Sequence, residues 1–285
     1  PNMKVANLIL ETFWQGFAAL LCIVCLLPGA AFADHHDEAS QLGQLVQGSH
    51  RSEANISRNN ARHPAQTLDF FGLKPDMTAI EILPGGGWYT EILAPFLRDE
   101  GKLYAAHFSP NAGLSYMAPS LGRFEEKLTA SPDLYGKTIV RHLNPPHETA
   151  IAPPGSADMA MTFRNVHNWI MAGQQAEFFE AFYTALKPGG ILGIVEHRAK
   201  PGSSLEVMET SGYVTEAYVK EIAAAAGFEF TGSSEINANA KDQTIYPRGV
   251  WTLPPTYRMG DENKAQFAAI GESDRMTLKF IKPLK

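Results

Sequence analysis

Apolar residues along positions 64–285 fall into two alternating arrangements, short continuous runs and longer stretches with helical spacing. The short runs predict seven strands, at residues 78–83, 102–107, 137–142, 158–163, 191–195, 228–231 and 276–281. The longer stretches predict helices at residues 64–72, 88–97, 120–129, 174–186 and 215–226. Because strands and helices alternate, we expect an α/β fold with right-handed crossovers and a mainly parallel sheet.

A glycine-rich turn follows the first predicted strand, at Pro84, Gly85, Gly86 and Gly87. Glycine lets the backbone turn sharply and lie close to a ligand, and the helix after the turn offers free N–H groups to a negative group. Glu81, just before the turn, is placed to accept hydrogen bonds from an amine. Ligands of parallel α/β sheets bind beyond the carboxyl ends of the strands, so this turn is a candidate binding site.

The same stretch resembles the first motif of the Rossmann-like, class I S-adenosylmethionine-dependent methyltransferases. That motif is an acidic residue followed by glycines two, four and six positions later. Glu81 matches the acid, Gly85 and Gly87 match the last two glycines, and Leu83 replaces the first. A nicotinamide dinucleotide site is disfavoured, because Thr90 stands where its third glycine belongs.

Two later segments extend the resemblance. Residues 186–192 are similar to the family's passage into its fifth strand, and residues 225–229 are similar to its entry to the sixth, so the resemblance covers residues 67–285. The whole looks most like a group of exported, uncharacterised predicted methyltransferases. It implies a three-layer Rossmann-like methyltransferase fold, a seven-stranded sheet with helices on both faces, and S-adenosylmethionine as cofactor.

The cofactor-binding residues follow from the resemblance and from the positions at strand ends. They are Glu81, Pro84, Gly85, Gly86, Gly87, Trp88, His107 and Asn165. His107 departs from the family pattern, which usually places an acid there to hold the ribose hydroxyls. A histidine still hydrogen-bonds a hydroxyl, but it lacks the charged acceptor.

Histidines also follow the fourth and fifth predicted strands, as His167 and His197, beside Arg164 and Glu196. Methyl transfer needs proximity and orientation, and sometimes a base that deprotonates the acceptor. We expect His167 or His197 to be that base, with Glu196 orienting or assisting it. The alternative is that these are ordinary polar residues with local hydrogen bonds. Their residue types also suit a metal site, but they lack helical i, i+4 spacing, and we assign no metal ligand.

Two segments flank the regular pattern. Residues 34–63 are predicted to be an N-terminal helical extension before the methyltransferase-like domain at 64–285. The extension carries Arg51, Arg58 and Arg62, which either cover the cofactor pocket and pair with its carboxylate or form a solvated face, the simpler interpretation.

Residues 236–275 are a long polar segment between the last two predicted strands. Long loops in compact domains are usually functional or flexible. We therefore expect a lid over the substrate, whose aromatic residues select an apolar or aromatic acceptor.

Residues 1–33 match a secretory leader, with an apolar run at 16–27, helix breakers and a small-x-small cleavage site ending at Ala33. We expect cleavage after Ala33, export to the periplasm and no stable membrane insertion thereafter. The alternative is an uncleaved anchor, because residues 12–33 carry no charge.

The chain has a net charge of −6, from 30 acidic and 24 basic residues, which disfavours a nucleic-acid partner. Residues 165–169 lack the Pro-Pro-aromatic signature of base and amide N-methylation. The sequence therefore predicts a methyltransferase that acts on an oxygen or nitrogen of a small molecule. Two alternatives stay open: a non-catalytic exported binding protein on this scaffold, and a metal-dependent enzyme that uses the strand-end histidines.

Overall fold

The computed structural model describes residues 41–284. The expected leader and its cleavage site at Ala33 lie outside the described residues. Of the helices that the structure describes, none is both long and apolar enough to cross a membrane.

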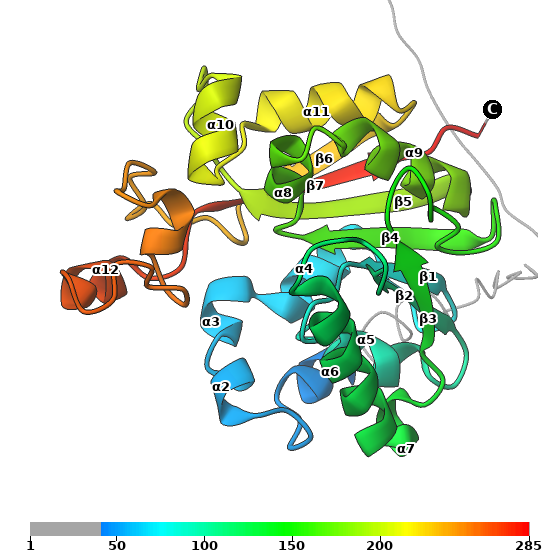
Figure 1. Ribbon diagram of the computed structural model, residues 1–285. Helices are drawn as coiled ribbons and strands as arrows, with labels where there is room; N and C mark the ends of the chain where they lie inside the picture. Colours follow the sequence, from blue (N-terminus) through cyan, green and yellow to red (C-terminus); the bar gives the residue numbers. More distant parts are fainter. Residues whose placement is uncertain (1–40, 285) are drawn as a thin grey trace, which may run out of the picture.

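The centre of the molecule is a seven-stranded sheet in the order β3-β2-β1-β4-β5-β7-β6. Its strands are β1 (Thr78–Ile82), β2 (Lys102–Phe108), β3 (Ile139–Leu143), β4 (Ala157–Phe163), β5 (Leu186–His197), β6 (Glu229–Ser234) and β7 (Arg275–Ile281). Strands β1 to β5 pair in parallel, and β7 pairs antiparallel with both β5 and β6. The mainly parallel sheet expected from the sequence is confirmed (Figure 1).

Helices cover both faces of this sheet (Figure 1). One layer contains α4 (Pro64–Phe71), α5 (Thr90–Leu97), α6 (Met117–Ala130) and α7 (Pro132–Tyr135). The other contains α8 (Val166–Met171), α9 (Gln175–Ala185), α10 (Leu205–Ser211) and α11 (Glu216–Ala225). Each layer buries its own hydrophobic cluster against the sheet. The three-layer arrangement is therefore as expected.

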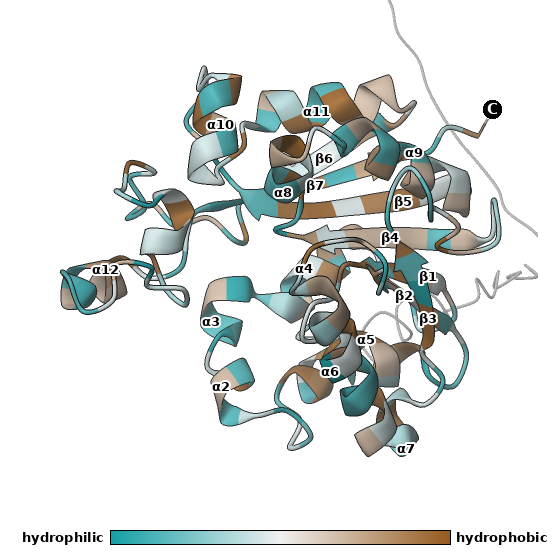
Figure 2. Ribbon diagram, in the orientation of Figure 1, coloured by the Kyte–Doolittle hydropathy of each residue, from teal (hydrophilic) through white to brown (hydrophobic). Residues whose placement is uncertain are grey.

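Side-chain spacing explains how these layers pack. Phe178, Phe179 and Phe182 of α9 fall on one helical face and are all buried. Each contributes about 1.5–3 kcal/mol relative to an exposed side chain. On the opposite face α4 packs so closely on β5 that a Cβ atom at Gly193 would lie 2.6 Å from the ring of Phe71. Figure 2 shows β5 running between the two layers with hydrophobic (brown) stretches.

The structure adds elements that the sequence pattern did not separate. The described part of the N-terminal extension is helical at residues 41–46, in α2 (Glu53–Ile56) and in α3 (Asn59–Arg62). The segment between β6 and β7 contains the 3-10 helix η1 (Gly249–Thr252) and α12 (Lys264–Ile270). Strand β5 begins at Leu186, directly after α9, and so earlier than expected.

Candidate active site

A cavity of about 480 Å³ lies at the carboxyl ends of β1, β4 and β5. Its volume falls in the range of small-molecule sites. Residues of α2 and α3, the glycine turn after β1, and the segment between β6 and β7 complete its walls. The N-terminal extension, the glycine turn and the segment 236–275 therefore surround one cavity at the strand ends.

The glycine turn leaves β1 through left-handed backbone conformations at Leu83 (φ 48°), Gly85 (φ 57°) and Gly87 (φ 77°). Leu83 stands at a glycine position of the family motif and keeps the left-handed conformation there. This conformation costs a residue with a side chain about 1–3 kcal/mol. A Cβ atom at Gly85 or Gly86 would meet no other atom within 4 Å. The backbone of these two residues is therefore open toward the cavity that they line.

Glu81 lines the cavity beside this turn, although only 2% of its surface is exposed. Its carboxylate accepts a hydrogen bond from the Thr90 hydroxyl, at the start of α5, at 2.5 Å. Burial raises the pKa of Glu81 to about 7, an effect that the bond from Thr90 opposes without cancelling. Near neutral pH this carboxyl group therefore gains or loses its charge with small changes in pH.

His107 does not contact the cavity, which differs from the expected ribose-binding role. The ring is fully buried, and its Nδ1 atom accepts the N–H of Phe108 at 2.8 Å. That assigns the ring proton to Nε2, which donates to the carbonyl oxygen of Gly85 at 3.0 Å. Because both nitrogens are occupied, His107 holds the glycine turn in place and has no atom left for a ligand hydroxyl.

His167 lines the cavity and is held by Glu196. The ring Nδ1 atom lies 2.9 Å from Oε1 of Glu196, and the backbone N–H of His167 donates to Oε2 at 3.2 Å. A carboxylate only accepts hydrogen bonds, so Nδ1 carries the proton and Nε2 keeps its lone pair. Glu196 is fully buried and outside the cavity lining, so it orients the histidine. With Nδ1 held by Glu196, His167 can accept a proton at Nε2.

His197 lies beside it, with the two imidazole centroids 5.3 Å apart. Its Nδ1 atom is 2.5 Å from the hydroxyl of Ser273, and its backbone N–H donates to Glu196 at 2.8 Å. Burial, together with the nearby His167 and Arg275, lowers the pKa of His197 well below its usual range. His197 is therefore neutral at physiological pH.

A metal site at His167, Glu196 and His197 is geometrically open, since their donor atoms lie within 4.8 Å of one another. However, both oxygens of Glu196 already accept N–H groups. The same cavity is lined by four arginines, whose positive charge opposes a cation. The chemistry of this donor set therefore favours proton transfer over metal binding.

The remaining expected residues have structural partners as well. Asn165 lines the cavity and donates from Nδ2 to the carbonyl oxygen of Ile82 and to the hydroxyl of Thr162, each at 3.1 Å. It therefore ties the ends of β1 and β4 together. Gly87 does not line the cavity, and a Cβ atom there would lie 3.1 Å from the ring of Phe124.

Trp88 lies against two guanidinium groups. The Cζ atoms of Arg51 and Arg62 are 4.6 and 4.5 Å from its ring centre. Its indole N–H donates to the carbonyl oxygen of Asn55 at 3.2 Å. Trp88 thus fastens the N-terminal extension to the cavity.

The arginines of the extension contradict the simpler interpretation of a solvated face. Arg51 is 3% exposed and Arg62 5% exposed, and Arg58 and Arg62 line the cavity. Arg275, at the start of β7, was not singled out in the sequence, although it lines the same cavity. Only the fold brings it beside the extension, because it lies more than two hundred positions later in the chain.

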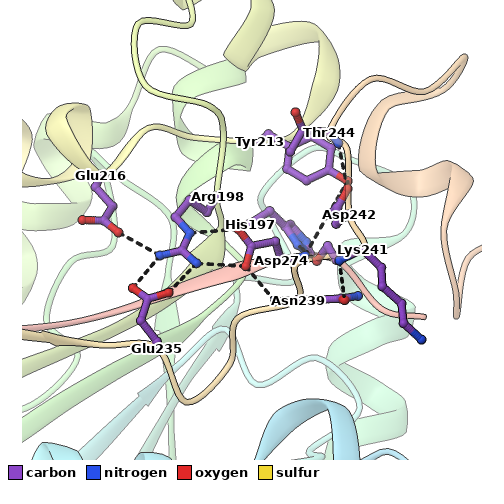
Figure 3. Close-up of polar contacts among 11 residues, drawn as sticks. His197, Arg198, Tyr213, Glu216, Glu235, Asn239, Lys241, Asp242, Thr244 and Asp274 are labelled. Atoms are coloured by element: carbon purple, nitrogen blue, oxygen red, sulfur yellow. Dashed lines mark hydrogen bonds and ion pairs between the residues drawn. The ribbon is translucent and has the colours of Figure 1, made fainter. Parts of the chain in front are cut away.

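A polar network fixes the segment 236–275 at its base (Figure 3). Arg198, just after β5, forms paired hydrogen bonds with Asp274 at 2.9 and 3.0 Å and with Glu235 at 2.7 Å each. Asp242 accepts the Tyr213 hydroxyl at 2.9 Å and the backbone N–H of Asp274 at 2.8 Å. Both ends of the segment are thereby held next to β5, close to His197 (Figure 3).

The cavity-lining part of this segment includes Trp251, whose ring centre lies 5.9 Å from that of His167 in an edge-on arrangement. Pro254 and Pro255 follow it along the cavity wall. The segment therefore forms the part of the cavity wall next to the candidate base.

No protein-family model matches the chain, and no curated protein matches it. Solved structures do. A SAM-dependent methyltransferase from Aquifex aeolicus has a TM-score of 0.50 and 21% identity, and the match covers 70% of this chain and 93% of that one. A geranyl diphosphate methyltransferase in complex with SAM has a TM-score of 0.53 and 11% identity, and the match covers 85% of this chain and 90% of that one. The [4+2]-cyclase SpnF has a TM-score of 0.53 and 15% identity, and the match covers 88% of this chain and 94% of that one.

Proposed function

We propose, starting from the class I S-adenosylmethionine-dependent methyltransferase fold that this chain has, that it methylates an oxygen or nitrogen of a small molecule. The observation that carries the proposal is the position of His167. Its Nε2 atom has a free lone pair, and His167 lines the same cavity as the open backbone of Gly85 and Gly86.

The glycine turn fits the cofactor, whereas the end of β2 does not supply its usual partner. Space beside Gly85 and Gly86 admits a ligand against the backbone, and Glu81 offers a carboxylate to an ammonium group. No carboxylate stands at His107 to hold the ribose. We therefore expect cofactor affinity to depend mainly on the turn and on Glu81.

S-adenosylmethionine, when bound, supplies an electrophilic methyl group on a positively charged sulfur. His167 accepts the proton of the acceptor's O–H or N–H group at Nε2, which frees a lone pair for the methyl carbon. The resulting imidazolium is stabilised by the Glu196 carboxylate at 2.9 Å from Nδ1. Trp251 and the prolines after it keep water from this proton transfer.

A non-methylating role is the second candidate, because one protein with the same fold is a [4+2]-cyclase. The altered position His107 favours it too, since both ring nitrogens are occupied within the protein. A fold alone does not fix a reaction. Cofactor binding separates the two candidates.

Calorimetric titration of the chain with S-adenosylhomocysteine tests the proposal. We expect micromolar binding that weakens strongly in Glu81→Ala. Glu125→Ala, at an exposed position on α6, is the matched control and should bind like the unaltered chain. A folded sample that does not bind the ligand would overturn the methyltransferase function and leave the second candidate.

We also propose export, on the leader pattern of residues 1–33. Expression in a bacterium with a periplasm, followed by N-terminal sequencing of the periplasmic fraction, is expected to give a chain that begins at Asp34. Recovery of the full-length chain in the membrane fraction would instead support the uncleaved anchor.

A further inference from the structure

Four guanidinium groups converge on one part of the cavity. Arg58 and Arg62 come from the start and end of α3, Arg164 follows β4, and Arg275 begins β7. Burial and the charges of Arg164 and Arg58 lower the pKa of Arg62, which shows that these groups lie close enough to repel one another. We call Arg58, Arg62, Arg164 and Arg275 the arginine cluster.

One carboxylate, Glu272, pairs with this cluster. It accepts from Arg58 at 2.6 Å, contacts Arg275, and lies 3.7 Å from Nε of Arg62. Burial raises its pKa, but Arg275, Arg58 and Arg62 outweigh burial and lower the pKa to about 2. Glu272 is thus fully ionised at neutral pH.

The cluster keeps a surplus of positive charge. Among the described residues, four guanidinium groups face the single charge of Glu272, so the cluster keeps more positive than negative groups, although burial and the neighbouring arginines lower the pKa of Arg62 to about 7. Glu81 is the one acidic side chain among the described residues that line the cavity, and burial raises its pKa to about 7. A folded protein seldom collects like charges in a buried space without a ligand of opposite charge.

Several donors of the cluster also lack a hydrogen-bond partner. They are Nη2 of Arg58, Nε of Arg62 and Nε of Arg275, and all three atoms are buried. Arg62 is 5% exposed and Arg275 2% exposed, so solvent does not satisfy them fully. Buried donors without partners are rare in folded proteins.

A purely structural role accounts for part of the cluster only. Glu272 and the carbonyl oxygen of Ala61, which accepts from Arg275 at 2.9 Å, fasten the segment 236–275 to α3. The side chain of Arg164, within the part of the chain described here, donates no hydrogen bond to another residue. Its backbone is nevertheless in the left-handed region (φ 62°), where a side chain is strained.

The cofactor does not match this charge either. S-adenosylmethionine carries one carboxylate against an ammonium and a sulfonium group, so its net charge is positive. We propose that the cavity takes a second ligand with at least two negative charges, a compact polycarboxylate or a phosphate compound, held by the arginine cluster. We take this second ligand to be the methyl acceptor, and this part of the inference rests on the proposed function.

This acceptor differs from the apolar or aromatic one expected from the aromatic residues of segment 236–275. Guanidinium groups bind carboxylates and phosphates through paired N–H donors in a fixed plane. Arg58, Arg62, Arg164 and Arg275 all line the cavity and carry donors of this kind. Trp251 and the prolines beside it then close over a charged ligand and exclude water.

The test is calorimetric titration of the full chain with citrate and, separately, with inorganic phosphate, with neutral triethyl citrate as the uncharged control. We expect one of the two anions to bind and the ester not to bind. Arg164→Gln should weaken anion binding about 10-fold or more, because a charge-assisted pair is lost. Arg123→Gln, at an exposed site on α6, is the matched control and should leave it unchanged.

Glu272→Gln should change anion affinity in the opposite direction to Arg164→Gln. It removes the competing carboxylate, so anion binding should tighten several-fold by electrostatic attraction. A gain of affinity cannot come from a loss of folding. Thermal unfolding of each variant verifies that it is folded. Absence of anion binding by the unaltered chain, or equal binding by Arg164→Gln, would overturn the inference.

Titration of the same samples with S-adenosylhomocysteine separates the two claims. Cofactor binding without anion binding refutes the arginine-cluster ligand and leaves the methyltransferase function standing. Anion binding without cofactor binding supports the anion site and refutes its role as a methyl-acceptor site.

Discussion

The glycine turn and the arginine cluster form parts of the same cavity, but the chain builds them in different ways. The turn is local, since Glu81 to Gly87 are consecutive residues that run from the end of β1 toward α5. The cluster is assembled from α3, the end of β4 and the start of β7. The turn offers open backbone, whereas the cluster offers charge with unpartnered donors. The two parts therefore suit ligands of different chemistry.

His167 belongs to neither part but lines the same cavity, and in the proposed function it is the base. This position gives the largest expected effect. His167→Gln should lower the rate of methyl transfer about 10²–10⁴-fold, because the base is lost. Binding of both S-adenosylhomocysteine and the anion should stay within a few-fold of that of the unaltered chain. A variant that lost both ligands would instead show that His167 has a structural role.

A side chain placed in the turn should separate the two parts most clearly. A Cβ atom at Gly86 would meet nothing within 4 Å, and Gly86 is not in the left-handed region, so Gly86→Val fills open space without backbone strain. We expect S-adenosylhomocysteine binding to fall about 100-fold by steric exclusion, while anion binding is unchanged. Calorimetry with each ligand measures both quantities. Equal losses for the two ligands would show that the turn and the cluster hold the same molecule.

The pH dependence of cofactor binding should come from Glu81. Its raised pKa of about 7 means that the carboxyl group is protonated below this pH and ionised above it. Because the ionised form attracts the ligand's ammonium group, affinity should rise as pH increases through 7 and fall by at most about tenfold per unit below it. Glu81→Gln should flatten this profile between about pH 6 and about pH 8, the range in which Glu81 titrates. A profile that persists in the variant would assign the titration to another group.

The smallest effect is expected at the base of segment 236–275. Arg198→Gln removes the paired bonds to Asp274 and Glu235, so the segment should open more often and lose its hydrogen-exchange protection. Anion binding should weaken only a few-fold, since Glu272 and Arg275 still fasten the segment to α3. Hydrogen-exchange mass spectrometry checks the opening. Unchanged protection across residues 236–275 would show that the segment is held by other contacts.

How far the sequence predicted this architecture depends on whether the signal was local. The strands and the helix α9 follow from apolar spacing, and the turn follows from consecutive glycines, so both were predicted. The pairing of His167 with Glu196 joins residues twenty-nine positions apart, and strand-end reasoning brought them together correctly.

The rest depended on contacts that no local pattern carries. His107 was expected at a ligand because of its place at the end of the second predicted strand, but its ring bonds back to Gly85. Arg62 was interpreted as part of a solvated face from the charge pattern, yet it lies over the ring of Trp88 and 3.7 Å from Glu272. The chain's net charge of −6 likewise conceals the local positive surplus of the cluster.

We infer that the turn and the cluster hold two different ligands at once. The most direct measurement is calorimetric titration of S-adenosylhomocysteine into the chain saturated with whichever of citrate and phosphate binds more tightly. We expect S-adenosylhomocysteine to bind with an affinity within about threefold of that measured without the anion, since the sites are separate. An apparent dissociation constant that rises in proportion to the anion concentration would contradict it, because the arginine cluster would then be binding the cofactor's own carboxylate.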